Sequence, residues 1–569
     1  MTDRAFIKPE MLSINHKNIT SMAIIDTIEG YIKASRHKPD LFVTDNVLLY
    51  EKIKKTLSKN IINSDINITQ KDINNWGNLF TAWGLYLDKE LNSIASQDKM
   101  YKCIQEAGHI SNFLLALICR LVGLLRVIDI KKLKKVIIVY SDNEKWHKSQ
   151  KHNRFISPYP FLSKNKFFGK AHVILERIEV NYIEHLSDSK TDSLFLRIFS
   201  AGILDNIIWK IINNKYFNFS QSVTVVKGDS EIIRESLSKL VFKGILPIAY
   251  HNVILKKNIR NCQSILKVKD VVNNLLKEKI NKNFSFNKNQ NNALLEIIIL
   301  ELQKKLTFAR ENSIEIDSFF NKIKKKYTKI RSIIVSSPNA TTAKYLHKVA
   351  KKNQIKVINF EHGLTTGINM RNKNYMSYSE ATNCDYMMVI NELAKKDYAL
   401  NKRDNIANLN IIGLPNQIKN IKNKKIVNFY IRSKYAFKKS DFCICHVSTL
   451  LFNGGIRFGT DTLTDYNINN FNYKILKKVY NNIDKKKIIF KDYPSVRYIY
   501  QPKLKDRVKV ENKNIFFEES GYWRYIRAIS DLIVTISFTS TFSWCVSAKV
   551  PVVFINMPHI RARHDWLQE

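Results

Sequence analysis

A cluster of hydroxyl side chains near the carboxyl end of the chain has the composition of a phosphate-binding loop. Ser537, Thr539, Ser540 and Thr541 follow an apolar, β-rich run at 532–536 and precede a short helical stretch. Hydroxyl groups donate hydrogen bonds to phosphate oxygens without adding a countercharge. Free N–H groups at a helix start also attract anions. The same residue types commonly cap helices, so a simple cap is the alternative interpretation.

A second apolar run at 550–555 follows that helical stretch. Strand, hydroxyl loop, helix and strand together predict one βαβ unit over 531–556. In such a unit the loop lies at the carboxyl end of a parallel sheet, which is the edge where ligands bind. We therefore expect the hydroxyl cluster at a ligand-binding edge.

An ionisable pair follows another predicted strand. The apolar run 357–360 leads directly into Glu361, His362 and Gly363. Histidine titrates near neutral pH and can act as a general base, and the neighbouring glutamate can substitute for it. A histidine beside a glycine also often has only a structural role. The sequence predicts a catalytic position here and leaves the structural alternative open.

Two further carboxylates, Asp142 and Asp229, are alternative bases, because each follows an apolar strand pattern, as Asp45 does. In one parallel sheet all three would project from the same edge. One of these carboxylates is also a candidate nucleophile, if the reaction proceeds through a covalent intermediate with retention of configuration. Each is also a common turn or N-cap residue, which is the more frequent use.

Cations and glycine at other strand ends suggest contacts to a diphosphate. Gly455 and Arg457 lie in the loop that follows the apolar run 442–447, and Lys491 follows the run 486–490. Positive charge at such positions stabilises a departing phosphate. The sequence shows no convincing pair of aspartates at a strand end and no set of metal ligands. We expect no metal and no cofactor.

The elements that position these residues alternate between strand and helix, which predicts an α/β fold of two Rossmann-like, doubly wound domains facing a cleft. We expect an N-terminal α/β region with helical segments at 1–130 and a first Rossmann-like domain at 131–415. A Lys/Asn-rich helical insertion or bridge is expected near 255–328. A linker at 416–440 would precede a nucleotide-binding Rossmann-like domain at 441–569. The chain stops soon after Ile555, which favours a truncated product.

The composition is that of a large globular protein with a strong positive charge. The chain has 569 residues, 45% hydrophobic residues and a net charge of +42. Lysine, asparagine and isoleucine dominate throughout, as expected from an AT-rich genome, and the lysines are not gathered in one arm. A basic nucleic-acid-binding protein is the non-enzyme alternative. It predicts a lysine stripe with interleaved aromatics, which the sequence lacks.

Apolar helical patterns in the first quarter of the chain predict core helices. Leu79, Trp83, Leu87 and Leu91 recur at helical spacing. The run 113–128 is shorter than the ~20 residues of a membrane span and contains two arginines, so we expect a buried helix. The start of the chain has no apolar signal segment, which favours the cytoplasm. Peripheral contact with the inner face of the membrane stays open.

Taken together, the run from Arg331 to Ile555 resembles in layout the GT-B glycosyltransferases of bacterial surface polysaccharides. It is also similar to sugar-nucleotide 2-epimerases and CDP-glycerol glycerophosphotransferases. The matching pieces are VINFEHGLTTG, CDYMMVINELAKKDYA, IIFKDYPS and SDLIVTISFTSTFSWCVSAKVPVVFIN. The resemblance implies that the hydroxyl loop holds the nucleotide phosphate and that His362 and Gly363 line the cleft. It also implies that Lys491 contacts base or phosphate.

Two departures from the resembled pattern affect the donor. Ser543-Trp544 stand where many members place a ribose-binding Glu, and Lys549 stands where a Gly precedes Pro-Val. We expect a glycosyltransferase of capsule or lipopolysaccharide biosynthesis. A CMP-linked acidic sugar, such as Kdo or a sialic-acid relative, is one donor to consider. The acceptor would be lipid-linked or an oligosaccharide. The alternatives are a glycerophosphotransferase or a sugar-nucleotide epimerase.

Overall fold

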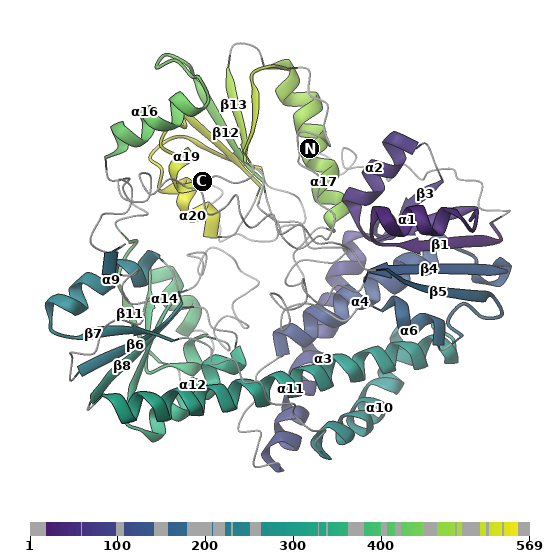
Figure 1. Ribbon diagram of the computed structural model, residues 1–569, viewed down its shortest axis with the longest axis horizontal. Helices are drawn as coiled ribbons and strands as arrows, with labels where there is room; N and C mark the ends of the chain where they lie inside the picture. Colours follow the sequence, from purple (N-terminus) through teal and green to yellow (C-terminus); the bar gives the residue numbers. More distant parts are fainter. Residues whose placement is uncertain are drawn as a thin grey trace.

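The computed structural model shows an α/β protein built on parallel sheets (Figure 1). The structure describes residues 19–57, 60–97, 107–141, 158–164, 166–178, 207–208, 222–228, 231–250, 263–327, 329–336, 340–361, 380–399, 407–415, 421, 423–448, 464–483, 486–491, 512–518, 523–536 and 540–555.

Three sheets are present in this part of the chain, and each defines a unit that we call first, second or third. The first sheet has the order β3-β2-β1-β4-β5, the second β11-β10-β9-β8-β6-β7 and the third β14-β13-β12-β15-β16. The strands are β1 (Ser21–Ile25), β2 (Leu41–Thr44), β3 (Ile61–Asn63), β4 (Lys135–Ser141), β5 (His172–Ile178), β6 (Ser222–Lys227), β7 (Leu246–Ala249), β8 (Lys329–Ser336), β9 (Lys356–Phe360), β10 (Tyr386–Val389), β11 (Asn408–Ile411), β12 (Cys443–Val447), β13 (Lys487–Lys491), β14 (Ile515–Glu518), β15 (Leu532–Thr535) and β16 (Val552–Phe554). All their pairings are parallel.

The helices cover these sheets and connect them. They are α1 (Ile28–Ser35), α2 (Val47–Leu57), α3 (Gln70–Gln97), α4 (Ala107–Val127), α6 (Tyr159–Lys164), α9 (Glu231–Phe242), α10 (Gln263–Asn283), α11 (Lys288–Lys326), α12 (Ala340–Lys352), α14 (Glu392–Ala399), α16 (Lys424–Lys434), α17 (Asp465–Lys474), α19 (Trp523–Ile526) and α20 (Ser540–Val546).

The predicted α/β class with doubly wound parallel sheets is confirmed, and the structure adds one sheet to the two that we expected. Strand β1 pairs with β2 on one side and with β4 on the other. The pairing therefore crosses the boundary predicted at residue 130. The physical reason is that Met22–Ile25 are buried, so this strand needs a neighbour on each side. The sequence does not set β1 apart, because only Asp26 and Thr27 separate its apolar residues from those of α1.

Helices α3 and α4 form the core beside the first sheet. Trp83, Leu87 and Leu91 are buried in one hydrophobic cluster with much of α4, and Leu79 packs against it, which confirms the predicted core stripe. Within the described residues α4 is the one helix long and apolar enough to cross a membrane, and 67% of its most apolar window is buried inside the protein. This burial agrees with the predicted core helix.

Helix α11 connects the first and second units. The residues Ala293–Ala309 contribute to the core of the first unit, together with α3, α4 and α10. The residues Ile316–Ile323 contribute to the core of the second sheet. Asn287 begins the helix with a capping box to Gln290. The segment 255–328, predicted as a helical insertion or bridge, thus contains a bridging helix.

The predicted linker at 416–440 contains a helix instead. In α16, Val427 and Ile431 are buried against Tyr525, Ile526 and the strands of the third sheet. These two residues are four positions apart, so they lie on the same face of the helix. Helix α16 therefore packs as part of the third unit.

The third unit contacts both other units. Tyr466 and Ile468 of α17 pack against α2 of the first unit, and Tyr466 lies 5.9 Å from Tyr50, centroid to centroid. Burial raises the pKa of Asp65, at the carboxyl end of the first sheet, with Asp45 and the α17 residue Asp465 adding to the rise. These contacts place the start of α17 against the ligand-binding edge of the first sheet.

A buried histidine in the central strand of the third sheet gives a pH-dependent stability. The His446 ring stacks on Phe490 at 4.5 Å, and its Nδ1 lies 2.8 Å from the Tyr480 hydroxyl. Burial lowers the pKa of His446 to about 3. The unfolded chain binds a proton near pH 6.5, so the stabilising contribution is present above that pH and is lost as pH falls toward 3.

We expect the free energy of unfolding of the third unit to fall by up to about 1.4 kcal/mol per pH unit on acidification because of this histidine. In His446→Gln that part of the slope should vanish, whatever the change in stability at neutral pH. Urea denaturation of the parent and the variant between about pH 7 and pH 4.5 measures it. Parallel pH profiles for the two proteins would contradict the assignment.

Candidate functional site

The order of the strands locates the crevices where such sheets bind ligands. From β12 the chain adds β13 and β14 on one side, and then β15 and β16 on the other. The direction of the crossovers therefore reverses between the carboxyl ends of β12 and β15, which is the position where doubly wound sheets generally bind ligands. In the second sheet the corresponding point lies between β6 and β8, and in the first sheet between β1 and β4.

Three of the predicted donor-binding residues, Lys491, Ser540 and Thr541, lie in elements next to the switch point of the third sheet. The hydroxyl loop follows β15, and Ser540 and Thr541 are the first two residues of α20. Val447, the last residue of β12, is in register with Thr535 on one side and with Lys491 on the other. Lys491 and the end of β15, which leads into the hydroxyl loop, therefore flank the end of the same strand. Ser537 and Thr539 lie outside the described residues.

Lys491 is held in place by its strand. It is buried, and its carbonyl oxygen accepts a hydrogen bond of 3.0 Å from the backbone N–H of Ser448. The segment that leaves β12 after Ser448 contains Gly455 and Arg457, and both lie outside the described residues. Of the residues predicted to hold the donor, the described part of the structure therefore includes Lys491, Ser540 and Thr541.

Glu361 lies at the end of β9 in the second sheet. The residue is buried, and its carboxylate oxygen Oε2 accepts a hydrogen bond of 3.1 Å from the N–H of Ile390. Its own N–H donates to the carbonyl of Met388 at 3.0 Å. These contacts fasten the ends of β9 and β10 to each other. His362 and Gly363 follow directly and lie outside the described residues.

The three aspartates predicted to share one edge belong to two sheets, which corrects that expectation. Asp45 follows β2, and residue 142 follows β4 in the same sheet, whereas residue 229 follows β6 in the second sheet. Asp45 is buried and pairs with Arg120 of α4, with 2.9 Å between Oδ2 and Nε. Its role is structural. Asp142 and Asp229 lie outside the described residues.

A small apolar contact joins the carboxyl ends of the second and third sheets. Trp544 of α20 packs against Ile390, together with Phe360 and Leu414. Ile390 follows β10, and Phe360 is the last residue of β9, two positions before His362. The helix that starts with Ser540 and Thr541 therefore touches the strand end that leads to the predicted catalytic loop.

A lysine that sequence reasoning did not select lies at the switch point of the second sheet. Lys227 ends β6, and its Nζ lies 4.1 Å from the centre of the Tyr250 ring. The next residue, Gly228, has φ +114°, and a Cβ there would lie 2.8 Å from the carbonyl oxygen of Ser336 in β8. In the described part of the chain Lys227 forms no ion pair. Only the strand order, which the sequence does not reveal, identifies this position.

Burial lowers the pKa of Lys227 to about 8, and the nearby Glu315 opposes the shift. Because lysine in an unfolded chain titrates near pH 10.4, we expect the stability of the second unit to rise between about pH 8 and pH 10 as the folded amine loses its proton. After ¹³C-dimethylation of lysines, one NMR resonance should titrate about two pH units below the rest. It should be missing in Lys227→Met. A normal titration for every lysine would contradict this expectation.

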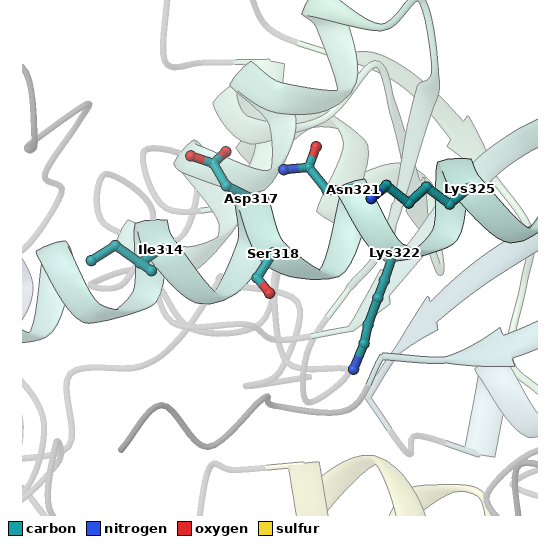
Figure 2. A pocket seen from close by; sticks show the side chains of 6 residues that line it. All are labelled: Ile314, Asp317, Ser318, Asn321, Lys322 and Lys325. Atoms are coloured by element: carbon teal, nitrogen blue, oxygen red, sulfur yellow. The ribbon is translucent and has the colours of Figure 1, made fainter. Parts of the chain in front are cut away.

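An open groove along α11 is distinct from these crevices. It is lined by Ile314, Asp317, Ser318, Asn321, Lys322 and Lys325, and has a volume of about 470 Å³ (Figure 2). Asp317 also accepts a hydrogen bond of 2.7 Å from the Tyr345 hydroxyl of α12. The groove holds none of the predicted site residues. We therefore place the candidate site at the strand ends.

Comparisons with known proteins returned similar folds. No family model and no curated protein matches the chain. Among solved structures, UDP-GlcNAc 2-epimerase from Methanocaldococcus jannaschii matches with a TM-score of 0.35 and 17% identity, over 59% of this chain and 85% of that one. The wall teichoic acid polymerase TagF matches with a TM-score of 0.31 and 13% identity, over 62% and 74%. The glycosyltransferase SnogD from Streptomyces nogalater matches with a TM-score of 0.30 and 10% identity, over 61% and 85%.

Proposed function

We propose that this protein is a glycosyltransferase that binds a nucleotide-activated sugar at the switch point of the third sheet. The observation that carries the proposal is the position of the hydroxyl loop. The loop follows β15, whose last residue, Thr535, is in register with Val447 at the end of β12. A loop rich in hydroxyl groups at this position of a doubly wound sheet is suited to a nucleotide phosphate.

In this proposal the third unit holds the donor. Ser537, Thr539, Ser540 and Thr541 donate hydrogen bonds to the phosphates. Lys491, on the far side of β12, supplies positive charge, and Gly455 and Arg457 complete the crevice. Positive charge and fixed donors stabilise the nucleotide as it departs. Because protein groups, and not a metal ion, stabilise the departing nucleotide in this proposal, sugar transfer should proceed equally well in the presence of EDTA.

The second unit supplies the base in this proposal. His362 removes the proton from the acceptor hydroxyl as that oxygen attacks the anomeric carbon, and the bond to the nucleotide phosphate breaks. The contact of Trp544 with Ile390 supports this division, because it joins α20 to the strand ends that lead to His362. Glu361 positions the loop through its hydrogen bond to Ile390, and Asp142 and Asp229 are the alternative bases.

We further propose a place for the reaction in building a bacterial capsule or lipopolysaccharide in the cytoplasm, on a lipid-linked or oligosaccharide acceptor. A CMP-linked acidic sugar is the first donor to test. Calorimetric titration with CMP, UDP, GDP and CDP tests the donor class directly. Binding of one of them in the micromolar range would support the proposal, and binding of none would overturn it.

The double variant Ser540→Ala, Thr541→Ala tests the donor loop. Each hydrogen bond to a charged phosphate is worth roughly 1.5–3 kcal/mol, so nucleotide affinity should fall at least ~100-fold for the pair. Stability should fall only by about the ~1 kcal/mol of a lost cap. Ser236→Ala is the matched control, since that hydroxyl on α9 bonds the carbonyl of Ile233. Unchanged nucleotide affinity in the double variant would reduce the loop to a helix cap.

The variant His362→Asn tests the base. Asparagine keeps a polar side chain but takes no proton near neutral pH, and loss of a general base typically costs ~10²–10⁴ in rate. We expect nucleotide affinity and melting temperature close to those of the parent, with sugar transfer at least ~100-fold slower.

Glu361→Gln is the control for the same strand end. The glutamine oxygen can still accept from Ile390, so this variant should retain most of its transfer rate. Retained transfer in His362→Asn together with a large loss in Glu361→Gln would move the catalytic role to the glutamate.

A further inference from the structure

The outward face of α16 presents a stripe of large apolar side chains to solvent. Ile426, Phe429 and Tyr430 are 40%, 75% and 38% exposed. Their spacing of three and four residues places them on one side of the helix. Exposure of single apolar residues is ordinary, but a row of three on one helix face is a feature of interaction surfaces.

The apolar stripe lies in a strongly cationic segment. Residues 416–440 contain eight lysine and arginine residues and no aspartate or glutamate. Lys424 and Lys425, in the first turn of α16, and Lys438 and Lys439, just beyond its end, are exposed. Positive charge therefore borders the apolar stripe at both ends of the helix.

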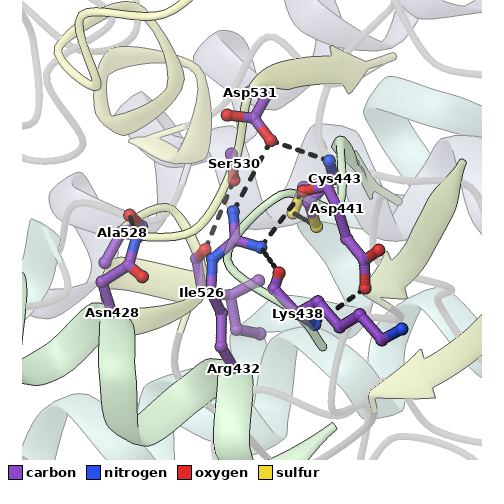
Figure 3. Close-up of polar contacts among 10 residues, drawn as sticks. Asn428, Arg432, Lys438, Asp441, Cys443, Ile526, Ala528, Ser530 and Asp531 are labelled. Atoms are coloured by element: carbon purple, nitrogen blue, oxygen red, sulfur yellow. Dashed lines mark hydrogen bonds and ion pairs between the residues drawn. The ribbon is translucent and has the colours of Figure 1, made fainter. Parts of the chain in front are cut away.

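The inner face of α16 is fastened to the third sheet, which fixes the direction of the outer face. Arg432 Nη1 donates to the carbonyls of Lys438 and Asp441 at 2.7 Å and 3.1 Å (Figure 3). Asn428 Nδ2 donates to the carbonyl of Ala528 at 2.9 Å. Asp531 links Arg432, at 3.7 Å, to the N–H of Cys443 in β12, at 2.8 Å. The helix is thus held by its polar and apolar inner side chains and lies at the outer margin of the third unit (Figure 1).

We propose that this face of α16 docks on the surface of an anionic lipid bilayer. A helix with an apolar stripe bordered by lysines is the arrangement that lies in a membrane interface, with its apolar side chains among the acyl chains and its cations at the headgroups. The face is a convex helix surface, which suits a bilayer. Nucleic-acid binding would not explain the exposed Ile426, because bases stack on aromatic side chains and not on aliphatic ones. The inference does not depend on the proposed function.

Sedimentation of the full chain with lipid vesicles tests the proposal. The parent should bind vesicles containing phosphatidylglycerol and should bind pure phosphatidylcholine much more weakly. Phe429→Ser should weaken binding to the anionic vesicles at least ~10-fold, because a large apolar side chain no longer enters the interface. Lys424→Gln with Lys425→Gln should weaken it roughly fivefold per lysine at low salt, and less at high salt.

Phe242→Ser is the matched control. Phe242 is 78% exposed at the end of α9, a helix of the second unit that also carries Glu231 and Glu235. The Phe242→Ser variant should bind anionic vesicles as tightly as the parent does. All four substituted positions are exposed, so the variants should have the melting temperature and the nucleotide affinity of the parent. Equal binding of the parent to both kinds of vesicle, unchanged binding by Phe429→Ser, or an equal loss in Phe242→Ser would overturn the proposal.

Discussion

Parallel pairing of strands is the constraint on which the rest of this structure depends. Two parallel neighbours cannot be joined by a tight turn, so each connection crosses the face of the sheet, usually through a helix. The carboxyl ends of all strands in a sheet then meet at one edge. Where the crossovers change direction, between β12 and β15 or between β6 and β8, a crevice results. The hydroxyl loop and Lys227 owe their positions to this topology.

The 39 residues of α11 span about 58 Å, which exceeds the width of one small domain. One part of the helix is buried with α3 and α4, and another part is buried under the second sheet. Separating the first and second units would therefore expose apolar surface along α11. Within the part of the chain that the structure describes, the third unit contacts the others through fewer apolar residues, namely Tyr466 and Ile468 on one side and Trp544 on the other.

The sequence was informative where a pattern is local. The strands and helix of the βαβ unit at 531–556 were predicted correctly because two short apolar runs flank a hydroxyl loop and a helix. The second run, β16, is partly exposed rather than buried as its apolar sequence suggests. The prediction of the core stripe on α3 was correct because the apolar face of this helix is continuous. Helix α16 was missed because its outward residues Ile426 and Phe429 are as apolar as its buried residue Val427, so no single face stands out. Lys227 was missed because strand order is a long-range property that spacing along the chain does not encode.

The short helix α20 belongs both to the candidate donor site and to the contact with the second unit. Its first residues, Ser540 and Thr541, lie at the candidate donor crevice, and Trp544 one turn later packs on Ile390 of the second unit. Arg527 Cζ lies 4.7 Å from the centre of the Trp544 ring, on the side of the third unit. A helix of seven residues has a weak dipole, so in the proposed function hydroxyl groups and cations would provide most of the affinity for phosphate. Because Trp544 joins the same helix to the second unit, any displacement of α20 would also change the contact between the two carboxyl edges.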